Sequence, residues 1–276
     1  MPVFDQSSNL TLYRDTKVVA HFVGLNYLTP AERELFDTYI RPGCALLDLG
    51  VGGGRTTEYL SHIASHYVGV DYSEGMVLAC RDKFPGLQFE VADAAELSLF
   101  PDNSFDAIVF SFNGIDYLAP DEKRQSCLRE CRRLLKQGGT FIFSVHNPHS
   151  LILGWSWDWS ALRARANKLS KGIPVLGCLA LAAVSVAKLG LTAWRVAVQS
   201  TPRVLRRIGT RAYWHGDGYL LDPAHGGLWT HCAVPNRVIA ELADFQFKFL
   251  QVLPENHPHK SRIWRTRWYY YAFSKT

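Results

Sequence analysis

The sequence predicts a doubly wound α/β fold, in which helices cover both faces of a mainly parallel sheet. Three observations indicate it: short apolar runs recur along the first half of the chain, apolar residues at helical spacing separate them, and a glycine-rich turn follows the first run. Strands that alternate with helices at short intervals are typical of βαβ units. With 276 residues, 47% hydrophobic and 20% charged, the chain is long enough for a large globular domain that carries an insertion.

Five strands are expected in the first half of the chain, at residues 44–49, 66–71, 87–93, 105–112 and 140–145. Helices are expected between them, at residues 55–66, 73–84 and 119–139. The last helix places Cys127, Cys131 and Leu134 on one face, and Gly138 and Gly139 are expected to end it.

The regular alternation stops after the fifth strand. A helix at 235–245 and strands at 246–253 and 266–274 are then expected to complete the sheet. The predicted architecture is therefore a seven-stranded sheet with a large, partly helical insertion after strand 5. Residues 1–147 and 235–276 form the predicted core, and residues 148–234 form the predicted insertion.

The turn after the first strand reads Asp48-x-Gly50-x-Gly52-x-Gly54. Such a turn between a strand and a helix lets a ligand approach backbone N–H groups and the helix N-terminus. The dinucleotide pattern GxGxxG would need a third glycine at position 55, where the chain has Arg55. The turn by itself indicates a nucleotide-like cofactor without choosing between NAD-type and S-adenosylmethionine-type ligands.

Polar residues also follow the next three strands. Asp71 ends the second strand, 21 residues after Gly50, where a carboxylate can accept hydrogen bonds from both hydroxyls of a ribose. Asp93 ends the third strand, and the segment Ser111–Gly114 follows the fourth. Three structural alternatives remain open: Asp71 as a helix N-cap, Asp93 as a solvated loop acid, and a plain turn at Asn113.

In this order and spacing, the motifs resemble those of the class I S-adenosylmethionine-dependent methyltransferase family, over roughly residues 40–147 and the C-terminal strands. The resemblance implies a Rossmann-like sheet, methyl transfer as the activity, and S-adenosylmethionine as the cofactor. It assigns the methionine part of the cofactor to the glycine turn and the ribose and adenine to the ends of strands 2 and 3. The cofactor-binding residues that it implies are Asp48, Gly50, Gly52, Gly54, Asp71, Tyr72, Met76, Asp93, Ala94, Ser111, Phe112 and Asn113.

The expected acceptor is a small molecule, most simply a hydroxyl of a glycolipid, an isoprenoid or a natural product. The N-P-P-Y and D-P-P-Y signatures that mark methylation of adenine or amide nitrogens in related enzymes are absent, so nucleic acid is not favoured. Methylation of nitrogen or carbon stays open, as does a non-catalytic cofactor-binding protein. His231, His215 and Asp217 are the predicted catalytic residues, and His146 and His225 are further candidates for a base, because a histidine can take the proton of a hydroxyl.

The insertion is strongly basic. Residues 151–211 hold ten Lys or Arg against one acid, Asp158, for a net charge of +9, while the whole chain has +5. The uncharged run 172–187 is shorter than the ~18 residues that cross a bilayer, which favours a substrate lid or a helix on a membrane surface. RNA could also bind these cations, but aromatic residues do not interleave with them. We therefore expect residues 151–211 to make peripheral contact with a membrane surface.

The remaining expectations concern location and cysteines. Residues 1–15 do not have the pattern of a secretory signal, so a cytoplasmic location, with possible membrane association, is expected. The six cysteines show no zinc-type spacing and are expected to be reduced thiols, and no metal is predicted.

Overall fold

The computed structural model describes residues 16–150, 205, 208–222, 228–259, 263 and 265–276. The chain divides into two compact units, residues 1–150 with 211–276, and residues 151–210. Most of the basic segment, the apolar run 172–187, Cys178 and His225 lie outside the described residues. The lid role of residues 148–234 therefore stays a prediction, and the account below concerns the first unit.

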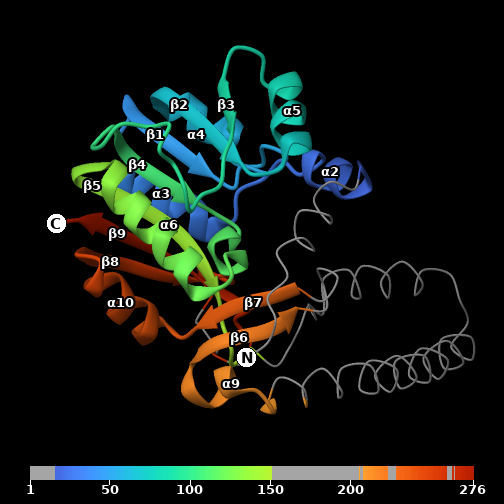
Figure 1. The fold of residues 1–276 in the computed structure, drawn as a ribbon, viewed down its shortest axis with the longest axis vertical. Helices are drawn as coiled ribbons and strands as arrows, with labels where there is room; N and C mark the ends of the chain where they lie inside the picture. Colours follow the sequence, from blue (N-terminus) through green and yellow to red (C-terminus); the bar gives the residue numbers. More distant parts are fainter. Residues whose placement is uncertain (1–15, 151–204, 206–207, 223–227, 260–262, 264) are drawn as a thin grey trace, which may run out of the picture. The chain divides into compact units, whose positions relative to one another are not determined.

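The first unit is built on a sheet of nine strands (Figure 1). Their bounds are β1 Cys44–Leu49, β2 Ala64–Asp71, β3 Gln88–Val91, β4 Phe105–Phe110, β5 Leu135–His146, β6 Asp217–Asp222, β7 Leu228–Ala233, β8 Phe247–Pro254 and β9 Trp268–Lys275. Strands β3, β2, β1, β4 and β5 are parallel neighbours, β9 runs antiparallel to β5, and β8 runs antiparallel to β9. These seven strands confirm the predicted doubly wound sheet.

Strands β6 and β7 were not expected from the sequence. They form an antiparallel pair that joins the sheet where His146, the last residue of β5, pairs with Cys232 of β7. The sequence analysis placed this segment in the insertion and assigned no strand to it, because glycines and other turn residues are frequent there. This pairing brings β6 and β7 to the carboxyl end of β5.

Helices cover the two faces of the sheet, as expected for a doubly wound fold (Figure 1). Helices α3 (Pro30–Tyr39), α4 (Thr57–Ile63) and α5 (Glu74–Lys83) pack on one face, and α6 (Asp121–Leu134) and α10 (Pro235–Asp244) pack on the other. Three further elements belong to the unit: α2 (Thr16–Val23), the 3-10 helix η1 (Gly114–Tyr117) and α9 (Arg211–His215).

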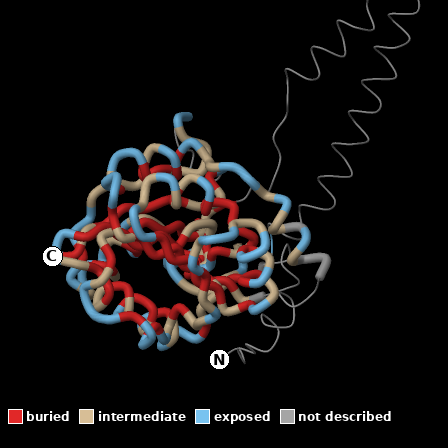
Figure 2. Tube along the Cα trace, turned by 90° about the horizontal axis from the view of Figure 1, so that it is seen from above, coloured by how far each residue is buried: buried red, intermediate tan, exposed pale blue. Residues whose placement is uncertain are grey.

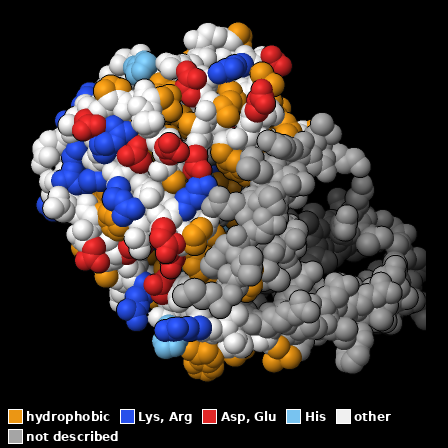
Figure 3. Space-filling view, viewed as in Figure 1, with side chains coloured by type: hydrophobic (Ala, Val, Ile, Leu, Met, Phe, Trp, Pro, Cys, Tyr) orange, Lys and Arg blue, Asp and Glu red, His pale blue; other side chains and the backbone are white. Residues whose placement is uncertain are grey.

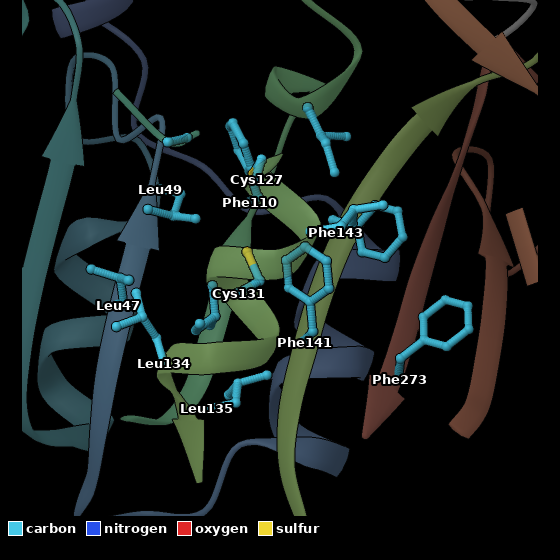
Figure 4. Packing of buried hydrophobic residues seen from close by; sticks show 14 of the residues in the cluster. Leu47, Leu49, Phe110, Cys127, Cys131, Leu134, Leu135, Phe141, Phe143 and Phe273 are labelled. Carbon is cyan, nitrogen blue, oxygen red and sulfur yellow. The ribbon is translucent and has the colours of Figure 1, made fainter. Parts of the chain in front are cut away.

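The core follows from the alternation of side chains along the strands. On the face of α6, Cys127, Cys131 and Leu134 pack toward strand residues such as Leu47 and Phe141 (Figure 4). The rings of Phe141 and Phe143 stack with centroids 4.6 Å apart, and Figure 2 shows the buried residues gathered in the strands between the helical layers.

Two details differ from expectation. Helix α6 ends at Leu134 and not at the glycines 138 and 139, because Leu135 already pairs with Phe105 in the sheet. Helix α3 was not expected, although Thr29 and Glu32 form a capping box that begins it.

The described cysteines and the described surface give no unusual feature. Cys44, Cys80, Cys127, Cys131 and Cys232 are buried and form no disulfide with one another. Within the described ranges, no helix is both long and apolar enough to cross a bilayer. On the face shown in Figure 3, acidic and basic side chains are interspersed, in keeping with ion pairs such as Arg133–Asp102 and Lys136–Asp106.

Candidate active site

The glycine turn lies at the carboxyl edge of the parallel strands, between β1 and α4. Gly50, Gly52 and Gly54 all have positive φ angles, a region that residues with a Cβ rarely adopt. At Gly52 a Cβ atom would meet nothing nearer than the Gly50 carbonyl oxygen, 4.0 Å away, so space is open there. At Gly53 a Cβ atom would lie 2.3 Å from the backbone nitrogen of Val23, at the end of α2. The turn thus presents open backbone at Gly52 while its other side is covered.

Asp48 stabilises this turn from the interior of the protein. Its buried carboxylate accepts hydrogen bonds from Thr56 Oγ1 at 2.8 Å and Tyr67 Oη at 2.9 Å. Burial raises the pKa of Asp48 to about 6, against the hydrogen bonds that lower it. The described partners of Asp48 are protein groups, and the contact with the cofactor that the family resemblance implies for Asp48 stays a prediction.

Asp71 ties the end of β2 to the glycine turn. Its Oδ2 accepts a hydrogen bond from Gly52 N and its Oδ1 one from Ser73 N, both at 2.9 Å. Burial raises the pKa of Asp71 to about 6. Ser73, not Asp71, is the N-cap of α5, so the alternative of a capping aspartate does not hold. Asp71 is an acid held at the strand end beside the open turn.

The end of β3 carries the second strand-end acid. Asp93 is 37% exposed, and its Oδ2 lies 2.5 Å from Lys123 Nζ of α6. Its Oδ1 accepts a hydrogen bond from Ala95 N at 3.0 Å. Ala94 and Met76 are buried. The acid is therefore within reach of solvent, but a lysine already pairs with it.

A buried ion pair that the sequence analysis missed links the glycine turn to α3. The Arg55 guanidinium donates to both carboxylate oxygens of Glu32, with Nη1–Oε2 at 2.9 Å and Nη2–Oε1 at 2.5 Å, and to the Tyr27 carbonyl at 2.8 Å. Ser111 also donates to Glu32, and the Phe112 ring lies 4.6 Å from the guanidinium carbon. Arg55 thus holds the ends of β1 and β4 together. Two features of the sequence could have indicated this ion pair: Arg55 directly follows the glycines of the turn, and Glu32 stands three residues after Thr29, as in a capping box.

The chain turns sharply after β4. Phe112 and Asn113 have φ angles of 58° and 64°, in the left-handed region, which costs about 1–3 kcal/mol per residue. Asn113 N donates to Ser144 Oγ of β5 at 2.7 Å, and the Phe112 ring packs against Trp268 with centroids 5.7 Å apart. Strain that the surroundings hold in place in this way is typical of functional sites.

Beside this turn lies a group that we name the histidine–aspartate cluster. Its members are Asn113, Asp116, His146, Asp217 and His231. Asp116 Oδ2, fully buried, accepts hydrogen bonds from His146 N at 2.7 Å and His146 Nδ1 at 2.8 Å. His146 Nε2 lies 3.3 Å from Asn113 Nδ2. His231 Nε2 lies 2.9 Å from Asp217 Oδ1, and its Nδ1 lies 3.7 Å from Asp116 Oδ1, beyond hydrogen-bond length.

Charges within the cluster shift its pKa values. Burial opposes ionisation of Asp116, but His146 and His231 lower its pKa below the usual value. Burial and the nearby Arg124 lower the pKa of His231, yet Asp116 and Asp217 outweigh them and raise it. The hydrogen bond with His231 lowers the pKa of Asp217. The cluster therefore favours the ionised form of both carboxylates and raises the tendency of His231 to hold a proton.

The structure brings two of the three predicted catalytic residues together. His231 and Asp217 are in contact, whereas His215 is exposed at the end of α9, where no polar contact joins it to the described members of the cluster. Asp116 was missed, because it lies in η1, two residues beyond the segment Ser111–Gly114 that the sequence analysis considered. Within the described residues, no group of three or more His, Cys, Asp or Glu is arranged to hold a metal ion.

Comparison with known proteins gives a family match over the centre of this unit. Residues 47–143 match the family model described as a methyltransferase domain. A probable S-adenosylmethionine-dependent methyltransferase of Mycolicibacterium smegmatis is 33% identical over 105 residues, which are 38% of this chain and 39% of that protein. A demethylmenaquinone methyltransferase of Clavibacter sepedonicus is 36% identical over 103 residues, 36% of this chain and 40% of that protein. The chain thus spans about two fifths of the length of these curated relatives.

Solved structures resemble the fold over nearly the whole chain. The CcbJ methyltransferase of Streptomyces caelestis has a TM-score of 0.59 at 15% identity, covering 96% of this chain and 98% of that one. The 1,6-didemethyltoxoflavin-N1-methyltransferase of Burkholderia thailandensis, solved with bound 1,6-didemethyltoxoflavin and S-adenosylhomocysteine, has a TM-score of 0.56 at 15% identity, covering 98% of this chain and 86% of that one. At these identities the likeness shows the fold alone.

Proposed function

We propose that this chain, which belongs to the class I S-adenosylmethionine-dependent methyltransferase family, transfers a methyl group to a hydroxyl of a small-molecule acceptor. The observation that carries the proposal is the carboxyl edge of β1 and β2, where the open backbone at Gly52 lies hydrogen-bonded to the buried carboxylate of Asp71. In parallel sheets of this kind, ligands bind at that edge, beside the point where the strand order reverses.

The described residues fit the cofactor. The open turn at Gly52 admits a ligand close to the backbone, and the Asp71 carboxylate at the strand end can accept from ribose hydroxyls. Asp93 with Ala94 would face the adenine, with Tyr72 and Met76 beside it. When bound, S-adenosylmethionine supplies a methyl group on a positively charged sulfur that leaves readily. What the protein then contributes is orientation of the acceptor and exclusion of water.

We expect the methyl acceptor to bind at the ends of β4 and β5. Ser111, Phe112 and Asn113 leave β4 next to the glycine turn, so they would line the junction of cofactor and acceptor. The histidine–aspartate cluster begins at Asn113 and supplies histidines that could take the proton of a hydroxyl. A hydroxyl of low acidity needs such a base, and this favours oxygen as the acceptor atom over an amine that is already nucleophilic.

A second candidate acceptor is a quinone of the demethylmenaquinone type. Demethylmenaquinone methyltransferases recur among the relatives, at 30–36% identity in four of them. Because the aligned parts cover only about half of those proteins or less, the substrate is open. An isoprenoid or other lipid-like acceptor would also suit an apolar lid, which is the role predicted for residues 148–234.

Methyl transfer tests the proposal directly. The full chain is incubated with S-adenosylmethionine labelled in the methyl group, together with either chemically reduced demethylmenaquinone or a panel of phenols and lipid alcohols. We expect label in an acceptor product, lost in Asp71→Ala and kept in Asp102→Ala, which removes an exposed acid paired with Arg133. Mass spectrometry of the product separates a methyl ether from a methyl group on carbon or nitrogen. Binding of the cofactor without transfer to any of these acceptors would favour a non-catalytic cofactor-binding protein.

A further inference from the structure

His146 lies at the carboxyl end of β5, beside the turn that follows β4. It is the last residue of β5, the strand next to β4, and its side chain is 15% exposed. Its Nε2 lies 3.3 Å from the side-chain nitrogen of Asn113, in the turn that leaves β4 beside the proposed methyl group. The rings of Tyr117 and Trp268 pack edge-on around the imidazole, at 6.1 and 6.2 Å between centroids, and fix its plane.

Two neighbours determine which ring nitrogen of His146 carries the proton. An ionised carboxylate can only accept a hydrogen bond, so Asp116 Oδ2, 2.8 Å away, requires a proton on Nδ1. The Asn113 amide nitrogen can only donate, so it requires a lone pair on Nε2. Both contacts specify the same neutral tautomer, the one in which a buried carboxylate orients a histidine and leaves its other nitrogen basic.

His231 lacks such a basic nitrogen. Its Nε2 lies 2.9 Å from Asp217 Oδ1 and its Nδ1 points at Asp116 Oδ1, 3.7 Å away. Both nitrogens face carboxylates, which stabilise a proton on each of them. His231 is thus suited to attract the second oxygen of Asp116 by its charge, at 3.7 Å, and poorly suited to accept a proton from an acceptor.

We propose that His146 is the catalytic base of the methyl transfer and that Asp116 and His231 are positioning residues that set its tautomer. The inference rests on the proposed function and assigns the base to β5, where the sequence analysis favoured His231. In the transfer, a lone pair of the acceptor oxygen forms the new O–CH3 bond as the S–CH3 bond breaks and its electron pair stays on sulfur. The acceptor hydroxyl takes the place of the Asn113 N–H at His146 Nε2, whose single lone pair then accepts the hydroxyl proton. The resulting imidazolium is paired with Asp116 and returns its proton to water after the product leaves.

The tautomer is tested on the full chain with ¹⁵N-labelled histidine and saturating S-adenosylhomocysteine. Long-range proton–nitrogen spectra at pH 8 should show, for His146, a protonated Nδ1 and an unprotonated Nε2. His146→Gln identifies the signal by its loss, and Asp116→Asn should shift the proton population toward Nε2. A proton on Nε2 of His146 in the unmutated protein would overturn the proposal.

Kinetics with para-substituted phenols supply the second arm, because a base matters less as the hydroxyl becomes more acidic. His146→Gln should slow methylation of the least acidic phenol by about 100-fold or more, and that of 4-nitrophenol far less. His62→Gln, which removes an exposed histidine of α4, is the matched control and should match the unmutated rate. An equal loss for all phenols, or a larger loss in His231→Gln than in His146→Gln, would overturn the assignment. Calorimetry with S-adenosylhomocysteine keeps the two proposals apart: unchanged binding in His146→Gln leaves the cofactor site intact, whereas absent binding in the unmutated chain would refute the proposed function itself.

Discussion

Two buried carboxylates flank the glycine turn, and the pKa of each is raised by burial to about 6. Asp48 faces inward to Thr56 and Tyr67, while Asp71 faces the turn and the start of α5. A group with such a pKa changes its charge just below neutral pH, so ligand binding at Asp71 should depend on pH.

We expect the affinity for S-adenosylhomocysteine to rise with pH up to about 6 and to level off above it. Ribose hydroxyls donate to an ionised carboxylate, so the ligand prefers deprotonated Asp71 and its binding must displace a proton below the pKa. The dissociation constant should then rise by about tenfold per pH unit below 6. Calorimetry between pH 5 and 8, in two buffers of different ionisation enthalpy, measures both the affinity and the proton released. Asp48→Asn should keep this dependence, because Asp71 remains; an affinity that falls as pH rises would contradict the role of Asp71.

The buried Arg55–Glu32 ion pair gives a second prediction at the scale of single residues, and it concerns the stability of the fold. Arg55→Met leaves the fully buried Glu32 carboxylate without its charged partner and should lower the free energy of unfolding by about 3–5 kcal/mol. Lys136→Met is the control, since it removes half of an exposed ion pair and should cost no more than about 1 kcal/mol. Urea denaturation measures both. The double variant Arg55→Met with Glu32→Leu should recover much of the loss, whereas equal stabilities of Arg55→Met and Lys136→Met would contradict a buried, paired charge.

At the scale of single elements, two glycine substitutions distinguish the effect of backbone strain from the loss of ligand contact. Gly52→Ala and Gly86→Ala both place a Cβ atom at positive φ in open space, so each should lower stability by about 1–2 kcal/mol. Gly86 lies in the turn before β3, away from the proposed cofactor. We therefore expect Gly52→Ala alone to weaken binding of S-adenosylhomocysteine, by tenfold or more. Calorimetry on both variants checks it, and equal affinities would mean that the open backbone at Gly52 is not the binding surface.

Local patterns explain why most elements could be predicted. Strands β1 and β4 and the second half of β5 are apolar runs, Asp71 is the last residue of β2, and Asp93 stands two residues after β3. The hairpin of β6 and β7 was missed because glycines and other turn residues are frequent around its strands, and because it joins the sheet only through β5.

The histidine–aspartate cluster illustrates what a sequence pattern cannot provide. Asp116 and His146 are 30 residues apart in the sequence, and His231 lies much later, in β7. Only the folded sheet brings the three side chains together. A single histidine in sequence has no visible partner. The choice between His146 and His231 depends on which ring nitrogens face carboxylates, and this is a property of the folded site.

For the whole molecule, charge is distributed unevenly. Residues 151–211 have a net charge of +9. Because the whole chain has a net charge of +5, the remaining residues together have −4. We expect the full chain to co-sediment with vesicles that contain anionic lipid at low salt and to be released as salt rises, because each Lys or Arg near such a surface contributes about 1 kcal/mol and salt screens it. Vesicles of neutral lipid are the control. Co-sedimentation that is indifferent to salt, or equal on neutral vesicles, would argue against electrostatic contact through this segment.

The account as a whole depends on where the cofactor binds. A crystal structure of the full chain with S-adenosylhomocysteine tests this most directly. We expect the homocysteine part over Gly52, the ribose hydroxyls on Asp71, the adenine beside Asp93 and the sulfur toward Asn113 and His146. A ligand bound away from the carboxyl edge of β1 and β2, or one whose ribose makes no contact with Asp71, would contradict the assignment.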